Sequence, residues 1–267
     1  MMMIKAIIFD LDDTLLWDKK SVKESFRAVC LEAEEKTGVF HEVFEETVRE
    51  EARQLYSKLD IFPFTKKIGI NPFEGLWGTF TDKTDIGFRQ MNAVIFDYQQ
   101  NAWTNALRKH DIFDESYGKY LAERFRYFRK KLPFLYEDTM DVLIELKKDY
   151  RLFLLTNGSP TLQNEKLEMS PQLVPFFEYI LVSGAFGVGK PDPSIFEHAL
   201  RLLSVTKEEA IMIGDNLNTD ILGSNRVGMK NIWINRDGQT NSDIPYHWEV
   251  ESLSEIPPLL KEIQRSK

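Results

Sequence analysis

The sequence Ile4-Lys5-Ala6-Ile7-Ile8-Phe9-Asp10-Leu11-Asp12-Asp13-Thr14-Leu15 joins a short apolar run to a cluster of aspartates. Between residues 4 and 9 only Lys5 is polar, a pattern typical of a buried strand in a parallel sheet. Open α/β sheets bind their ligands beyond the carboxyl ends of the strands. We therefore expect Asp10, Asp12 and Asp13 to lie in a region where a ligand binds.

This aspartate cluster has two interpretations. Aspartate is common in turns and at helix caps, but a single residue would serve either purpose. Asp10, Asp12 and Asp13 lie within four residues and repel one another. A divalent cation, which takes oxygen ligands, would neutralise them. The cluster therefore favours a cation site over a simple turn.

After Leu132-Pro133, short apolar runs alternate with helical patterns. Such alternation predicts a parallel sheet covered by helices on both faces, and the first strand belongs to the same sheet. Besides that first strand, we expect strands at 151–156, 179–182, 210–213 and 231–234. The expected fold class is α/β, with a Rossmann-like, doubly wound parallel sheet as the core.

Residues 17–132 differ from the rest, because their apolar residues recur at three- and four-residue spacing, which predicts helices. We expect an all-helical cap domain at 17–132, inserted into a core made of 1–16 and 133–267. Glycines, prolines and aromatic residues interrupt the helices at 61–84, and we favour packing of these aromatic side chains over a role as a lid. A basic cluster near the end of the insertion is interpreted as a solvated face: Arg124, Arg126, Arg129, Lys130 and Lys131.

Three later segments place polar residues after expected strands or before expected helices. Thr156-Asn157-Gly158-Ser159 follows the second strand, and alone its Asn-Gly pair is a turn signal. The segment from Gly184 to Lys190 has the spacing of a phosphate loop, but Pro191 replaces the required Ser or Thr, so we reject that interpretation. Gly214-Asp215 follows an apolar run, and Asp220 comes five residues after Asp215.

Taken together, the four segments resemble the four motifs of the haloacid dehalogenase (HAD) superfamily. In motif order, the matching residues are Asp10, Asp12 and Thr14, then Thr156 and Asn157, then Lys190, then Gly214, Asp215 and Asp220. The helical insertion between motifs one and two also resembles the first cap type of that superfamily.

The resemblance implies a role for each matching residue. Asp10 would be the nucleophile and Asp12 the general acid and base. The phosphoryl group of the substrate would be bound by Thr156, Asn157 and Lys190. Mg²⁺ would be held by Asp10, Asp215 and Asp12, the last through its backbone carbonyl. Asp220 would hold Lys190 or support the metal ligands, and Asn216 would orient a neighbouring ligand.

The expected activity is that of a Mg²⁺-dependent phosphomonoesterase that acts through an aspartyl-phosphate on a small phosphorylated metabolite. Enzymes with this cap type hydrolyse phosphoserine, nucleoside monophosphates, sugar phosphates or phosphoglycolate, and phosphoserine is our leading expectation. Trp17, Asp18 and residues of the cap are candidates for selecting the leaving group. The alternatives are a phosphomutase, a haloacid dehalogenase, which would lack the second aspartate present here as Asp12, and a non-catalytic binding protein of the same fold.

Composition limits the partners of this 267-residue chain. Its net charge of -8 argues against a nucleic-acid-binding surface. Cys30 is the single cysteine, so no intramolecular disulfide forms, and we expect it in the core of a protein from a reducing compartment. The sequence has no apolar run long enough for a membrane span and no recognisable signal segment, which predicts a cytoplasmic protein without membrane contact. Either a monomer or a homodimer is compatible with these features.

Overall fold

The computed structural model describes residues 3–240 and 243–265 of the chain. These residues form two compact units, each with its own apolar core. The α/β unit comprises residues 3–17, 135–158, 170–240 and 243–265, and the helical unit comprises residues 18–134 and 159–169.

Within the described part of the α/β unit, six strands form one parallel sheet in the order β3-β2-β1-β4-β5-β6. The strands are β1 (Ala6–Phe9), β2 (Arg151–Thr156), β3 (Tyr179–Val182), β4 (Ala210–Gly214), β5 (Lys230–Ile234) and β6 (Trp248–Val250). In the register of the sheet, Phe9 of β1 lies beside Leu154 of β2 and Ile213 of β4. The parallel sheet confirms the predicted α/β class.

The sixth strand, β6, was not expected from the sequence, which indicated five. It has only three residues and pairs with β5, with Trp248 beside Ile232 and Val250 beside Ile234. Of its side chains only Val250 is buried. A run this short and this exposed carries no periodic apolar signal, so only its pairing with β5 identifies it as a strand.

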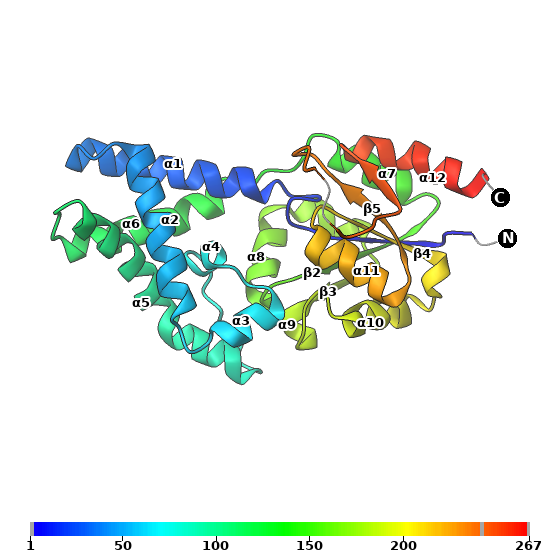
Figure 1. Cartoon of the computed structure of the whole chain (residues 1–267), viewed down its shortest axis with the longest axis horizontal. Helices are drawn as coiled ribbons and strands as arrows, with labels where there is room; N and C mark the ends of the chain where they lie inside the picture. The colour runs from blue at the N-terminus through cyan, green and yellow to red at the C-terminus, as the bar shows by residue number, and fades with distance from the viewer. Residues whose placement is uncertain (1–2, 241–242, 266–267) are drawn as a thin grey trace. The chain divides into compact units, whose positions relative to one another are not determined.

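Helices cover both faces of the sheet, as Figure 1 shows for α10 (Pro193–Leu203) and α11 (Leu222–Val227) on one face and α7 (Thr139–Leu146) and α12 (Ile256–Arg265) on the other. Alternate sheet residues such as Ile8, Phe153 and Met212 pack with Phe196 of α10 in one apolar cluster. The unit is completed by α9 (Ser183–Phe186) and by short 3-10 or π turns at Pro171–Phe176, Lys207–Glu209, Leu217–Ile221 and Leu253–Glu255. The sheet is thus doubly wound, as expected.

The helical unit consists of α1 (Asp18–Thr37), α2 (His41–Ser57), α3 (Phe62–Ile68), α4 (Pro72–Gly75), α5 (Ile86–Lys109), α6 (Glu115–Lys131) and α8 (Pro160–Met169). Its core contains Cys30, which is fully buried, as expected for a structural cysteine. The aromatic-rich segment at 61–84 forms the short helices α3 and α4 and places Trp77 and Phe80 fully inside this core. Among the helices of the described residues, none combines the length and apolarity that a membrane span needs.

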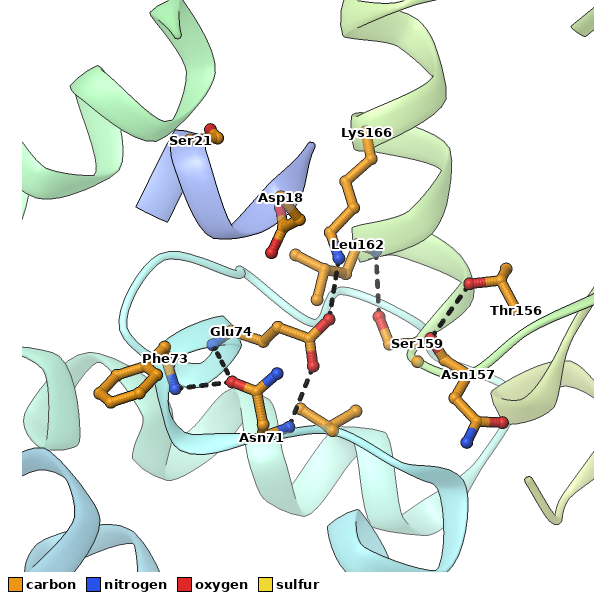
Figure 2. Close-up of polar contacts among 12 residues, drawn as sticks. Asp18, Ser21, Asn71, Phe73, Glu74, Thr156, Asn157, Ser159, Leu162 and Lys166 are labelled. Carbon is orange, nitrogen blue, oxygen red and sulfur yellow. Dashed lines mark hydrogen bonds and ion pairs between the residues drawn. The ribbon is translucent and has the colours of Figure 1, made fainter. Parts of the chain in front are cut away.

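Helix α8 belongs to the helical unit, although the sequence analysis assigned residues 159–169 to the core. Figure 2 shows Lys166 of α8 pointing toward Glu74 of α4, and their Nζ and Oε1 atoms lie 2.9 Å apart with both side chains buried. The other Glu74 oxygen accepts a hydrogen bond from the Asn71 amide at 3.0 Å. Leu162 of α8 is also part of the apolar core of this unit.

The interpretation of the basic cluster as a solvated face is wrong for Arg129. This side chain is only 1% exposed, and its guanidinium Nη2 lies 2.6 Å from Oδ1 of Asp18. It also donates to the hydroxyl of Ser21 and lies over the ring of Trp77, 4.9 Å from the ring centroid. Charge alone gave no sign of this burial, because the partners of Arg129 lie on α1 and in the 61–84 segment, far away in the sequence.

Candidate active site

Three of the predicted site residues lie at the carboxyl ends of neighbouring strands. Asp10 directly follows β1, Thr156 is the last residue of β2, and Asp215 follows β4. β1 lies between β2 and β4, and the amide of Asp10 donates to the carbonyl oxygen of Ile213 at 3.0 Å. The parallel register therefore brings one polar residue from each strand to the same edge of the sheet.

Lys190 lies between two aspartates at this edge. Its Nζ atom is 2.5 Å from Oδ1 of Asp10 and 2.7 Å from Oδ1 of Asp220. The three side chains are exposed by 2%, 10% and 0%, respectively, so water screens these charges weakly. Burying a charge without a partner is costly, and the two carboxylates offset that cost for the lysine.

The pKa values of Asp10 and Lys190 reflect this competition. Burial raises the pKa of Asp10 to about 6, and the charge of Lys190 opposes that shift only in part. Burial alone would lower the pKa of Lys190, but the carboxylates of Asp10 and Asp220 outweigh it and hold the pKa above its usual value. Burial is therefore the main cause of the raised Asp10 pKa, with the nearby Asp220 carboxylate adding to it, whereas the two carboxylates are the cause of the raised Lys190 pKa.

Asp220 approaches the site closely because residue 214 is glycine. A Cβ atom at Gly214 would collide with the Asp220 carboxylate. The other Asp220 oxygen, Oδ2, accepts a hydrogen bond from the amide of Asn216 at 3.1 Å. Asp220 lies within the π-helical turn Leu217–Ile221 and not at the cap of a helix. Its carboxylate contacts Lys190 and the Asn216 amide and caps no helix.

Asn157 contacts the backbone of Lys190 at two points. Its Nδ2 atom donates to the Lys190 carbonyl at 3.0 Å, and its Oδ1 atom accepts from the Lys190 amide at 2.9 Å. The next residue, Gly158, donates its amide hydrogen to the hydroxyl oxygen of Ser183 at 2.9 Å. The Asn157 side chain therefore fixes Lys190 in place, a function that the sequence did not reveal.

Thr14 connects motif one to motif four. Its hydroxyl oxygen accepts a hydrogen bond from the amide of Asp215 at 3.1 Å, and the hydroxyl donates to Oδ2 of Asp10 at 3.4 Å. Thr14 is fully buried, so these partners replace the water that its hydroxyl would otherwise bind. Its side chain sets the separation between the two aspartates.

The acidic residues of this site fit a divalent cation. Among the described residues, Asp10, Asp215 and Asp220 each offer a carboxylate oxygen within 4.8 Å of the others. Octahedral Mg²⁺ binds oxygens at about 2.1 Å, so its ligands lie at most roughly 4.2 Å apart. Both Asp220 oxygens contact Lys190 or Asn216, and both Asp10 oxygens contact Lys190 or Thr14, so these contacts do not choose between the two aspartates, and the ligand roles of Asp10 and Asp215 stay predictions. The ligand role assigned to the Asp12 carbonyl stays a prediction.

Asp12 and Asp13 lie in the loop that follows β1. The amides of Leu15 and Leu16 both donate to the carbonyl of Leu11 at 2.9 Å, which closes the loop on itself. Asp13 has a φ of 58°, in the left-handed region, where aspartate is found more often than most residues other than glycine. The loop therefore turns sharply at Asp13, directly after Asp12.

Arg236 was missed by the sequence analysis. It lies just beyond β5, at the same edge of the sheet, and donates from Nη1 to the Asp13 carbonyl at 3.1 Å and from Nη2 to the Thr14 carbonyl at 3.2 Å. Its guanidinium carbon is 3.6 Å from the centroid of the Tyr136 ring, and Trp17 stacks on the same ring at 5.1 Å. A lone arginine after a strand has no motif, so no sequence signal marked it.

Comparison with known proteins places the chain in a family. Residues 4–228 match the model of the haloacid dehalogenase-like hydrolase family. The chain is 34% identical over 234 residues to the phosphoserine phosphatase of Thermus thermophilus, which covers 87% of this chain and 89% of that protein. It is 35% identical over 187 residues to the N-acylneuraminate-9-phosphatase of Rattus norvegicus, covering 66% and 73%. It is 33% identical over 189 residues to the glyceraldehyde 3-phosphate phosphatase of Pyrococcus furiosus, covering 68% and 78%.

Solved structures share the fold. The HAD-hydrolase YfnB from Bacillus subtilis, solved bound to magnesium, has a TM-score of 0.66 at 21% identity and covers 97% of this chain and 99% of its own. A HAD phosphatase from Thermococcus onnurineus has a TM-score of 0.57 at 23% identity, covering 96% and 98%. The chain therefore belongs to the haloacid dehalogenase-like hydrolases, in the branch whose curated relatives are phosphatases.

Proposed function

We propose that this protein is a Mg²⁺-dependent phosphomonoesterase that hydrolyses a small phosphorylated metabolite through an aspartyl-phosphate on Asp10. One observation carries the proposal: Lys190 contacts both Asp10 and Asp220 at the strand ends, and Asp215 lies within 4.8 Å of these two aspartates. A phosphate dianion repels a carboxylate nucleophile, so the attack needs positively charged groups close to both anions. Lys190 supplies one such charge.

In the first step, a carboxylate oxygen of Asp10 attacks phosphorus opposite the ester oxygen. The bond from phosphorus to the leaving oxygen breaks, and Asp12 donates a proton to the alkoxide as it leaves. Lys190 offsets the charge of the phosphoryl oxygens, and the Thr156 hydroxyl binds one of them. The products of this step are a free alcohol and phosphorylated Asp10.

In the second step, Asp12 is a carboxylate and takes a proton from a water molecule. The resulting nucleophile attacks phosphorus, the bond to Asp10 breaks, and inorganic phosphate leaves. Bound Mg²⁺ would neutralise phosphoryl charge in both steps, with Asp10 and Asp215 as its protein ligands. The proton that Asp12 took from water leaves it protonated and ready to act as an acid on the next substrate.

Asp12 also supports the phosphatase over a haloacid dehalogenase. A halide leaves carbon without needing a proton, whereas an alkoxide leaving a phosphate ester does need one. An aspartate two residues after the nucleophile is therefore useful for ester cleavage and unnecessary for dehalogenation. A phosphomutase would use the same two aspartates, and the assay below separates it because a mutase releases no phosphate.

We infer a small substrate from the named activities of the curated relatives, which act on a phosphorylated amino acid, an acidic sugar phosphate and a triose phosphate. Phosphoserine remains the leading candidate, because its phosphatase from Thermus thermophilus shares 34% identity over 87% of the chain. We further propose a cytoplasmic location, for which the single, buried cysteine is suited.

The test is phosphate release from phosphoserine, sugar phosphates and nucleoside monophosphates, with Mg²⁺ and with EDTA. We expect release that requires Mg²⁺ and falls by roughly 10³-fold or more in Asp10→Asn, since this change removes the nucleophile but keeps the side-chain size. Hydrolysis at the wild-type rate by Asp10→Asn would contradict the covalent mechanism. If the folded wild-type protein releases phosphate from none of these esters, the proposed function is contradicted.

A further inference from the structure

The loop of residues 11–16 carries Asp12, and three features outside the loop hold its backbone. The hydroxyl of Thr139 donates to the Leu15 carbonyl at 3.0 Å, and the Tyr136 amide donates to the same carbonyl at 3.4 Å. The third feature is Arg236, which binds the carbonyls of the two preceding residues, Asp13 and Thr14. All of these residues belong to the α/β unit.

The guanidinium of Arg236 is well suited to this position. A planar guanidinium presents parallel N–H donors, and here they bind two consecutive carbonyls, an arrangement that a single ammonium donor does not reproduce. The ring of Tyr136 covers one face of the guanidinium at 3.6 Å, and Trp17 also stacks on that ring, with an interplanar angle of 18°. Stacking on Tyr136 therefore restricts the rotamer of Arg236 in addition to the two hydrogen bonds.

Arg236 binds the loop backbone immediately after Asp12, where the chain turns. Asp13 has the left-handed φ of 58°, and Arg236 donates to the carbonyl of this same residue. Asp12 directly precedes Asp13, so the orientation of the Asp12 side chain depends on how this backbone is held. General acid catalysis requires the proton to be within hydrogen-bond reach of the leaving oxygen, and small displacements reduce it strongly.

We propose that Arg236 is a positioning residue that holds the 11–16 loop so that Asp12 delivers its proton to the leaving group. This inference rests on the proposed phosphatase function and adds a residue outside the four motifs. Arg236 acts through the Asp13 and Thr14 carbonyls and makes no direct contribution to the reacting atoms.

The test compares leaving groups in the first step, which kcat/KM reports. An alkyl phosphate needs a proton at its leaving oxygen, whereas p-nitrophenyl phosphate releases a stable phenolate and needs little help. For Arg236→Gln we expect kcat/KM to fall by about 10- to 100-fold for alkyl phosphates and by less than about 3-fold for p-nitrophenyl phosphate, since misplacing the acid affects only the first kind of substrate. Arg236→Lys keeps the positive charge but lacks the two parallel N–H donors of the guanidinium. It should therefore show a smaller loss of kcat/KM, again confined to alkyl phosphates.

Two controls separate this role from general damage. Arg151→Gln changes an arginine that, like Arg236, donates to a backbone carbonyl, that of Leu203, and in addition binds the Glu178 carboxylate, but it lies at the start of β2. It should leave both kcat/KM values within about 2-fold of wild type. In the Asp12→Ala background, Arg236→Gln should have almost no further effect on alkyl phosphates, because the group that it positions is already gone.

An equal loss for both leaving groups in Arg236→Gln and Arg236→Lys would overturn the inference, and so would additive losses with Asp12→Ala. Either result leaves the phosphatase function intact, because wild-type turnover is then still measured. Absence of wild-type turnover for every ester would instead contradict the proposed function itself.

Discussion

Asp220 illustrates how a single side chain depends on its surroundings. The sequence placed it five residues after Asp215, and the resemblance implied a contact with Lys190, which the structure places at 2.7 Å. The sequence did not reveal that Gly214 makes room for this carboxylate or that Asn157 holds the lysine backbone. Such contacts join residues far apart in the chain and leave no local pattern.

Replacing Asp220 with asparagine should reduce turnover without unfolding the protein. The change removes one of the two carboxylates that hold Lys190, so the ammonium group is less firmly positioned, and we expect kcat to fall by about 10²-fold. The measurement is steady-state phosphate release at saturating Mg²⁺. Asp149→Asn, at an exposed position beyond α7, serves as the control and should keep the wild-type rate. An Asp220→Asn enzyme as fast as this control would show that Asp220 does not position Lys190.

The elements were predicted with uneven success, and the differences have physical reasons. Strands β1 to β5 were found because each is a mainly apolar run of four to six residues, whereas β6 has three residues, of which only Val250 is buried. Helix α8 lies in the expected core at 133–267, so its membership of the helical unit was missed. Its partners, including Glu74, come from a segment without regular periodicity.

The buried pair of Lys166 and Glu74 should be important for the stability of the helical unit. In Lys166→Met the Glu74 carboxylate keeps its bond from Asn71 but loses its cation while buried, which should lower the free energy of unfolding by about 3–5 kcal/mol. Urea unfolding followed by fluorescence of the buried Trp77 and Trp103 measures this change.

Adding Glu74→Gln to Lys166→Met should restore most of the lost stability, because the double variant buries no unpaired charge and glutamine still accepts from the Asn71 amide. Lys261→Met, which removes an exposed ion pair with Glu145, is the control and should change stability little. A Lys166→Met protein as stable as this control would contradict the account of the pair.

For the molecule as a whole, the order of motifs along the chain was the most informative feature. Alternation of apolar runs with helical patterns predicted the parallel sheet, and four polar segments beyond an apolar run or before a helix predicted which residues meet at its edge, because parallel strands all end on one side. Arg236 and the Tyr136 ring that covers it could not be predicted, because neither lies in a motif and their contact joins residues 100 positions apart. Sequence therefore indicates the polar residues at the edge of the sheet better than it indicates the distant residues that contact them.

The most direct test of the account uses Asp12→Asn with p-nitrophenyl phosphate. The leaving phenolate needs no acid, so Asp10 should be phosphorylated at a near-normal rate, while the water step, which needs Asp12 as a base, should be slow. We predict a burst of one phenolate per active site, and mass spectrometry of acid-quenched protein should show one phosphoryl group on the peptide that contains Asp10. Mg²⁺-dependent turnover by the wild type, combined with no burst and no phosphoryl group on Asp10 in this variant, would contradict the proposed mechanism.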